Sequence, residues 1–478
     1  MEEKKKNKIN FNIETLLYIY IILCPILDMA SFIFRNIFNT SISPSTIVRP
    51  LIAIISIVYI FFKYKFKVKL IIAGAIYGIY PIAHLLVFKT LQSGSSYSGI
   101  VHELQYLINY TFMVLNLFIY IYIFKDKEKN KLKQCIIISS IIYIVSIYIA
   151  ILTGTSSATY MEIGMGFKGW FESGNSISAI LTLTLFVLLT MVKDKKYRWT
   201  ALGTILAIGV FLTTLIGTRV GLFGFVLVLG VYLLIEIIIS FLNKIKIDKK
   251  LIIGGIIVIL GVVIIVILVG SNTLERRKYL EEEEIKVIDK ELNEGAHITG
   301  DLMKIKSKIE NGILEEGFMN EPEKQSVIDL YNIAKEKDLS HTQMRTLQLI
   351  YNFRLVKNQS NIVYILFGNG YMNQFYEMVL EMEVPAFLFN FGVIGFILYF
   401  IPFFAVFAYA FYMAIKNIRK IDSEYLMLLA GSGFTFALSF FSGYTFFNAS
   451  TMMIEIVINS LLMIKIYNFK DTKKEGNV

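Results

Sequence analysis

Long apolar runs separated by short polar segments dominate the chain from end to end. Each run holds about 20 residues, the length that an α-helix needs to cross roughly 30 Å of hydrocarbon. The runs lie at about 14–34, 46–62, 69–88, 105–124, 135–153, 176–193, 199–217, 219–242, 251–270, 384–414, 424–446 and 449–468. The pattern therefore predicts twelve membrane-spanning helices, most of them joined by short loops.

Helices are the expected form of these runs, because every backbone N–H and C=O group in lipid needs a partner within its own segment. The predicted fold class is an all-α polytopic membrane protein. The chain would then divide into residues 1–270 with spans one to nine, a large polar segment at 271–383, and residues 384–478 with spans ten to twelve and a tail.

The large polar segment carries helical patterns of its own. Asn320 followed by Pro322 predicts a capped helix start, and Ser340–Gln343 predicts a capping box that opens a helix through about Lys357. The apolar face of that last helix is Met344, Leu347, Tyr351 and Leu355. Further helical patterns lie at 274–292, 301–311 and 327–337. We expect a mostly helical cap over one end of the bundle, with the acidic run 281–284 as a solvated face.

Composition agrees with the membrane interpretation. Apolar residues make up 55% of the chain and charged residues only 18%, and the mean hydropathy is +0.61. A soluble domain carries about a quarter charged residues, so a disordered chain, a fibrous protein and an ordinary soluble enzyme are excluded. Cys24 and Cys135 are too few for a disulfide framework or a four-ligand zinc site, and four histidines disfavour a histidine-based metal centre. We expect no metal and no cofactor.

The net charge of +10 reflects orientation in the membrane. Lysine and arginine mark the cytoplasmic loops of membrane proteins, and here they gather in every second loop. The basic segments are residues 1–8, 63–69, 125–133, 193–198, 243–250, 416–420 and the C-terminal tail. Both termini are therefore expected in the cytoplasm and residues 271–383, whose net charge is −6, outside. The rest of the chain carries a net charge of +16, and because this basic balance reflects membrane topology, nucleic-acid binding is not expected.

Charged residues at the edges of the spans gather at the expected outer side. These residues are Asp28, Arg49, Glu103, Arg219, Glu377, Glu381, Glu383 and Glu455, and only Glu236 lies nearer the cytoplasm. Charges in lipid usually mark a partner, a pathway or a site. Asp28 and Arg49 are equally compatible with a structural ion pair, and His84 is expected to be a packed span residue. Arg219, in a hairpin with almost no loop, favours phosphate binding.

Several motifs together resemble the O-antigen ligase and O-antigen polymerase superfamily, especially its Gram-positive capsule and wall-polysaccharide members. They are Pro25–Asp28 followed by Arg49, Gly166–Asn175 with Trp170, Leu215–Gly221 around Arg219, Arg345 followed by Leu366–Gly370, Glu381–Gly395, and Phe441–Tyr444. The resemblance covers nearly the whole chain and implies a bundle like that of GT-C glycosyltransferases. It also implies transfer of a glycan from undecaprenyl diphosphate to a hydroxyl at the outer face of the cytoplasmic membrane, with inversion and without a metal.

The resemblance assigns roles to individual residues. Arg219, Arg345 and Arg49 would bind the diphosphate. Family ligases carry a histidine eleven residues before the glycine that matches Gly392; Glu381 occupies that position here, and Glu381 and Glu383 are both candidates for the general base. Supporting roles would fall to Asp28, Tyr444, Trp170 and Asn175.

The chemistry of such a transfer leads to the same residue types. Diphosphate is a good leaving group, so what it needs is positive charge on the departing oxygens. The acceptor hydroxyl needs a base, and a carboxylate near a low-dielectric boundary suits that task. Arginines and one glutamate supply both.

We expect a polymerase that joins lipid-linked repeat units, with a lipid-linked donor and acceptor as substrates. A chain-length regulator and a flippase are candidate partners. Within the same chemistry the alternative is a ligase that transfers the glycan to another acceptor. The richness in Lys, Ile, Asn and Tyr is typical of AT-rich genomes, many of them Gram-positive, where a lipopolysaccharide acceptor is missing. A flippase-type transporter would show two related halves, and no internal repeat is visible.

Overall fold

The computed structural model describes most of the chain: residues 12–40, 43–63, 67–91, 99–161, 163–244, 249–279, 281–282, 300–315, 317–337, 339, 343–371 and 378–475. Several expectations fall outside the described residues. They concern the basic residues 1–8, Ser340–Thr342 of the expected capping box, the second half of the acidic run 281–284, and Glu377.

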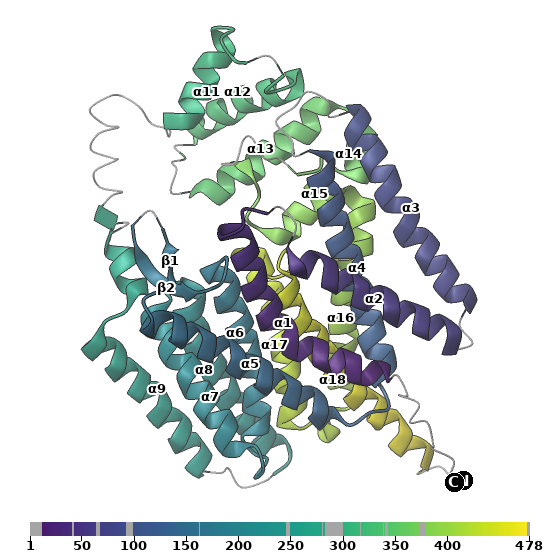
Figure 1. Ribbon diagram of the computed structural model, residues 1–478, viewed down its shortest axis with the longest axis vertical. Helices are drawn as coiled ribbons and strands as arrows, with labels where there is room; N and C mark the ends of the chain where they lie inside the picture. Colours follow the sequence, from purple (N-terminus) through teal and green to yellow (C-terminus); the bar gives the residue numbers. More distant parts are fainter. Residues whose placement is uncertain are drawn as a thin grey trace, which may run out of the picture.

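A bundle of long helices forms the main body (Figure 1). Its helices up to the polar segment are α1 (Ile13–Asn36), α2 (Pro44–Lys63), α3 (Lys67–Leu91), α4 (Ile100–Phe124), α5 (Lys129–Leu152), α6 (Gly174–Met191), α7 (Arg198–Val210), α8 (Arg219–Leu242) and α9 (Lys249–Val269). The helices after it are α15 (Glu383–Tyr399), α16 (Ile401–Lys416), α17 (Ser423–Phe441) and α18 (Ala449–Glu475).

The predicted fold class is confirmed. Within the described residues, ten helices are long and apolar enough to cross a membrane, and two bent helix pairs bring the number to twelve if each pair is one span. The centre of the bundle is occupied by α6 and α18, whose apolar stretches are 89% buried. By contrast, α3 is 11% buried and leaves most of its apolar surface for lipid.

The tenth expected span, 384–414, is not one helix, because α15 and α16 meet at an angle of 45°. Proline has no N–H and collides with the carbonyl four residues earlier, so Pro402 at the start of α16 interrupts the helix. The carbonyl of Leu398 thereby loses its helical donor and accepts a hydrogen bond of 2.9 Å from the hydroxyl of Tyr77 instead.

A second irregularity lies within α15, where Gly392 has φ 67° and ψ −176°. The carbonyls before it find donors outside the helix. Phe389 and Asn390 accept from the backbone N–H groups of Asn369 and Gly370, both at 2.8 Å, and Phe391 accepts from the hydroxyl of Tyr80 at 2.5 Å. The Gly368–Gly370 segment thus closes a break in a membrane helix.

A short hairpin is the one strand structure among the described residues. β1 (Ser157–Tyr160) pairs antiparallel with β2 (Met165–Gly169), in the segment where the sequence indicated only a loop. Positive φ angles at Gly164 and Gly166 let the chain turn there. A Cβ at Gly166 would lie 2.3 Å from the carbonyl oxygen of Ile216, so the hairpin packs directly on the tight connection between α7 and α8.

That connection is as short as the sequence predicts. α7 passes into a π-helical turn, η1 (Phe211–Leu215), and α8 begins at Arg219. The hydroxyl of Thr218 caps α8 by accepting from the backbone N–H of Gly221 at 3.1 Å. Arg219 is therefore held at a helix start and cannot move as part of a flexible loop.

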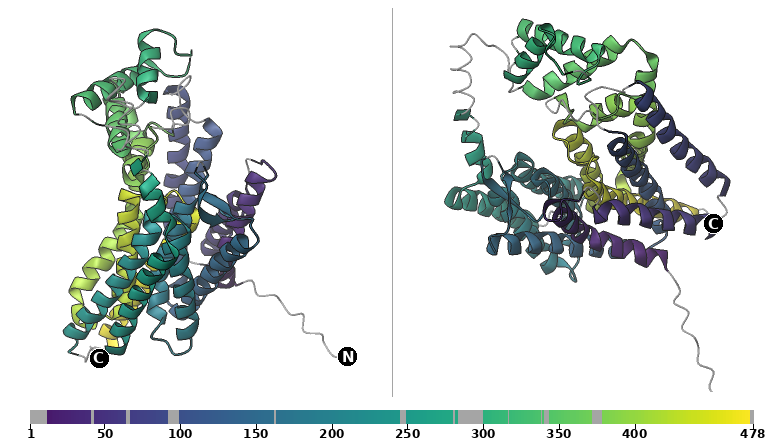
Figure 2. Two further views of the ribbon diagram at one scale, coloured as in Figure 1. Left: turned by 90° about the vertical axis from the view of Figure 1, so that its left-hand side faces the viewer. Right: turned by 45° about the horizontal axis from the view of Figure 1, so that its top comes forward.

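The polar segment forms a helical layer across one end of the bundle, while the end of α18 lies at the other (Figures 1 and 2). The layer consists of α11 (Gly300–Glu310), α12 (Glu321–Glu336), α13 (Met344–Gln359) and α14 (Ile362–Phe367). Asn320 and Glu323 form a capping box at the start of α12. Leu347, Tyr351 and Leu355 are fully buried, which confirms the predicted apolar face of α13.

Candidate functional site

Arg345 and Glu381 lie together where the helical layer meets the bundle. Arg345 is in the first turn of α13, and its Nε donates to Oε2 of Glu381 at 3.2 Å. Its Nη1 donates to the carbonyl of Phe441 at the end of α17. Both charged side chains are about half exposed, at 48% and 46%. The pair is thus solvent-accessible, and Glu381 keeps capacity for a further partner.

Glu383 has a different environment two residues later. It is fully buried at the start of α15. One carboxylate oxygen accepts from the backbone N–H groups of Thr445 and Phe447, both at 2.8 Å. The other accepts from the N–H of Phe446 at 2.9 Å and from the hydroxyl of Thr445. Glu383 therefore holds the 445–447 turn in place, and both of its oxygens are already hydrogen-bonded twice.

The turn that Glu383 holds passes close to Glu381. Gly443 and Tyr444 both have positive φ angles, and a Cβ at Gly443 would lie 2.3 Å from the carbonyl oxygen of Glu381. Beside the turn is a cavity of about 330 Å³, called here the Glu381 cavity. Its lining is Met344, Gln348, Val379, Leu380, Glu381, Tyr444 and Phe447. The structure thus brings Glu381, Tyr444 and the start of α13 together.

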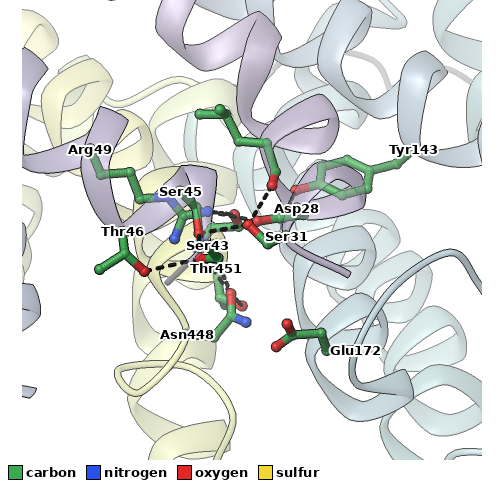
Figure 3. A network of polar contacts seen from close by, with 12 residues as sticks. Asp28, Ser31, Ser43, Ser45, Thr46, Arg49, Tyr143, Glu172, Asn448 and Thr451 are labelled. Carbon is green, nitrogen blue, oxygen red and sulfur yellow. Dashed lines mark hydrogen bonds and ion pairs between the residues drawn. The ribbon is translucent and has the colours of Figure 1, made fainter. Parts of the chain in front are cut away.

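A larger cavity of about 510 Å³, called here the Asp28 cavity, lies on the other side of Phe447, which lines both. Helices α1, α2, α4 and α6 and the residues around Asn448 enclose it. Asp28 and Arg49 form an ion pair of 2.6 Å in its wall (Figure 3). The same guanidinium donates to the hydroxyl of Ser450 at 2.6 Å, and Tyr143 donates to Asp28 at 2.6 Å.

A second ion pair borders the Asp28 cavity. Arg35, two turns after Asp28 on α1, donates to Glu172 at 2.9 Å. Glu172 lies between β2 and α6, and its side chain faces Asn448 (Figure 3). Burial raises the pKa of Glu172, and Arg35 opposes that rise.

Arg219 lines neither of these two cavities. It is exposed, and among the described residues it makes no hydrogen bond or ion pair, including with Arg345 or Glu381. Arg276 lies close enough for the two positive charges to act on each other, and it stacks over the ring of Tyr160 at 3.6 Å and donates to its hydroxyl at 2.8 Å. Two guanidinium groups, neither of which forms an ion pair in the described part of the chain, favour an anionic ligand.

Of the other residues singled out from the sequence, Trp170 and His84 have structural partners. Trp170 donates from Nε1 to Thr155 at 2.9 Å, and Asn175 is half-buried in the first turn of α6. His84 is a packed span residue, as predicted: it is buried, and its Nε2 lies 2.8 Å from Glu103. The second oxygen of Glu103 accepts from the N–H of Tyr371 at 2.9 Å, so the pair anchors the chain just after Gly370.

The carboxylate of Glu455 is satisfied by hydrogen bonds from neutral side chains. It is fully buried between α17 and α18, and it accepts from Ser432 at 2.6 Å, Thr435 at 2.7 Å and Asn459 at 2.9 Å. Glu236, toward the other end, pairs with Lys193 at 2.6 Å. Both contacts join helices to one another. In the described part of the chain, no three His, Cys, Asp or Glu side chains gather in a way that could hold a metal ion.

Sequence reasoning missed part of the Asp28 cavity. Gln105 and Asn109 on α4 line it, as do Arg35, Glu172 and Asn448. A signal was present in the spacing, because residues 102, 105 and 109 put a polar stripe on one face of an apolar helix. Likewise, residues 28, 31 and 35 share one face of α1. Arg276 gave no such signal.

A comparison with protein-family models gives one informative match. The model described as "O-antigen ligase like membrane protein" matches residues 10–469. No curated protein and no solved structure matches the chain.

Proposed function

Because the chain belongs to the O-antigen ligase like family of membrane proteins, we propose that it is a polymerase of undecaprenyl-diphosphate-linked repeat units. Family membership supports a multi-pass membrane protein that processes lipid-linked glycans. The proposal adds the reaction: the growing glycan leaves its carrier and joins a hydroxyl of a new carrier-bound repeat, at the outer face of the cytoplasmic membrane.

The contact between Arg345 and Glu381 carries the proposal. The two groups that the reaction needs, a cation for the diphosphate and a base for the hydroxyl, lie side by side and half exposed, and Glu381 lines the cavity named after it. In the resting state they neutralise each other. An incoming diphosphate competes for Arg345, because guanidinium binds phosphate oxygens strongly, and this frees the Glu381 carboxylate.

The bond changes then balance without a metal. The acceptor hydroxyl attacks the anomeric carbon from the face opposite the diphosphate, so a new C–O bond forms with inversion. The bond from that carbon to the diphosphate oxygen breaks, and the carrier diphosphate leaves with its electron pair. Glu381 takes the hydroxyl proton, while Arg345 stabilises the negative charge on the leaving group.

Glu383 is a positioning residue in this proposal. Its oxygens already accept four hydrogen bonds from the 445–447 turn, so it is a poor proton acceptor for a substrate. A ligase would use the same groups with a different acceptor, and the description of the family names that activity. Identifying the product distinguishes the two.

The decisive experiment uses the purified full chain in liposomes with lipid-linked repeat units extracted from cells that make the protein. Arg345→Ala and Glu381→Gln should each lower polymer formation by about 10²–10⁴-fold, because each removes one partner of the transition state. Matched controls are Arg354→Ala on the same helix and Glu336→Gln on α12, which should retain normal polymer.

Normal glycan ladders from Arg345→Ala or from Glu381→Gln would contradict the mechanism. Movement of the lipid-linked repeats across the bilayer without polymer would show a transporter instead. Transfer to an acceptor other than a carrier-bound repeat would show a ligase.

A further inference from the structure

We infer that the Asp28 cavity binds the sugar residues of the acceptor, an inference that rests on the proposed polymerase activity and gives that activity a second substrate site. The cavity lies beside the Glu381 cavity, and Phe447 belongs to the walls of both. The two cavities therefore adjoin at Phe447, which places an acceptor in the first close to the base in the second.

Charge argues for a neutral ligand. Arg49 is paired with Asp28 at 2.6 Å, and Arg35 is paired with Glu172 at 2.9 Å. The two arginines and two carboxylates cancel, so the cavity offers a diphosphate no net attraction. Arg49 is also largely buried and bound to Ser450, whereas Arg345 is 48% exposed and can turn toward a diphosphate.

The remaining lining offers what a sugar needs. Sugars present many hydroxyl groups, which both donate and accept hydrogen bonds, and flat C–H faces, which pack on aromatic rings. Gln105 and Asn109 line the cavity, and within the described residues their amides make no hydrogen bond. Asn448 uses its carbonyl oxygen for Ser450 and Thr451, which leaves its NH₂ group for a ligand. The half-buried Tyr106 supplies an aromatic ring.

Size favours the acceptor over the growing chain. The volume of about 510 Å³ falls within the range of about 300–1,000 Å³ that is typical of small-molecule sites. A site of that size fits a short oligosaccharide such as one repeat unit, the substrate whose size is constant.

The test measures binding of a phosphate-free probe to the full chain in lipid nanodiscs. The probe is the repeat-unit oligosaccharide, released from its lipid carrier by mild acid and radiolabelled at its reducing end. The double variant Gln105→Ala/Asn109→Ala should raise the Kd at least tenfold, while Arg345→Ala should bind like the wild type. Asn116→Ala, two turns further along α4 and outside this cavity, is the matched control and should also bind normally.

Thermal melting of each variant shows whether it is folded, and Asn109→Asp, which keeps the shape of the side chain, replaces the double variant if that one fails to fold. Absence of saturable binding by the wild type would overturn the inference. So would unchanged binding by the cavity variants, or loss of binding on Arg345→Ala. Because polymer formation by Arg345 and Glu381 variants is a separate assay, the polymerase proposal can stand when the acceptor site fails.

Discussion

At the scale of single residues, the environment gives two identical side chains different roles. Glu381 is half exposed and has one charged partner, whereas Glu383 is fully buried and accepts four hydrogen bonds. From the sequence both were equal candidates for the base. The difference depends on the 445–447 turn, about 60 residues later in the chain, and no local pattern around residues 381–383 contains it.

This difference predicts that substitution by glutamine lowers the stability of the protein much more at position 383 than at position 381. Glu383→Gln puts an NH₂ group against backbone N–H donors and should cost about 3 kcal/mol or more of stability, because buried donors lose a charged acceptor. Glu381→Gln should change stability by less than about 0.5 kcal/mol, as exposed positions do. Apparent melting temperatures of the two variants in detergent measure the effect. Equal melting temperatures would contradict the buried role of Glu383.

At the scale of elements, the breaks in α15 and between α15 and α16 are the features that shape the site. The break at Gly392 is closed by the Gly368–Gly370 segment, and a Cβ at Gly392 would lie 2.4 Å from the backbone of Leu366. This interlock between the Gly368–Gly370 segment and the break at Gly392 fixes the position of α15. The helix begins at Glu383, so its position also determines where Glu381 lies, two residues earlier.

Gly392→Ala should therefore destabilise the protein by about 3 kcal/mol or more, since the new methyl group meets backbone atoms and the residue must keep a positive φ. The matched control is Gly230→Ala within α8, where a Cβ meets nothing within 4 Å. The yield of monodisperse protein after heating compares the two. A stable Gly392→Ala variant would show that the break can rearrange.

The sequence predicts the spans well because lipid imposes one simple requirement, a long apolar stretch. It does not predict the breaks within α15, since their carbonyls find donors on Tyr80, Asn369 and Gly370, far away along the chain. The same holds for the candidate site. Asp28 and Arg49 were recognisable as a pair, but Glu172 and Asn448 join their cavity only through the tertiary fold.

At the scale of the whole molecule, the helical layer lies across one end of the bundle (Figures 1 and 2). The layer has a hydrophobic core of its own, which includes Val327, Leu330 and Leu347. Phe88, at the end of α3, joins that core and links the layer to the bundle. The layer can therefore cover the Glu381 cavity through α13, which supplies Met344 and Gln348 to its wall.

The distribution of lysine and arginine predicts that this end faces the exterior. Ile313 lies between α11 and α12 and is 70% exposed, and Trp199 lies at the start of α7 and is 80% exposed. In intact protoplasts, a membrane-impermeant maleimide should label an Ile313→Cys variant, whereas Trp199→Cys should need permeabilisation. Cys24 and Cys135 are buried and should give little background. The reverse labelling would place the site in the cytoplasm.

The interlock at Gly392 also bears on biogenesis. Tyr80, Asn369 and Gly370, which satisfy the three carbonyls at the break, all precede those carbonyls in the chain. Ribosomal synthesis therefore delivers each donor before the acceptor that depends on it. When residues 383–399 enter the bilayer, every donor that their interrupted backbone needs has therefore already been synthesised, so this span does not have to wait for a later part of the chain.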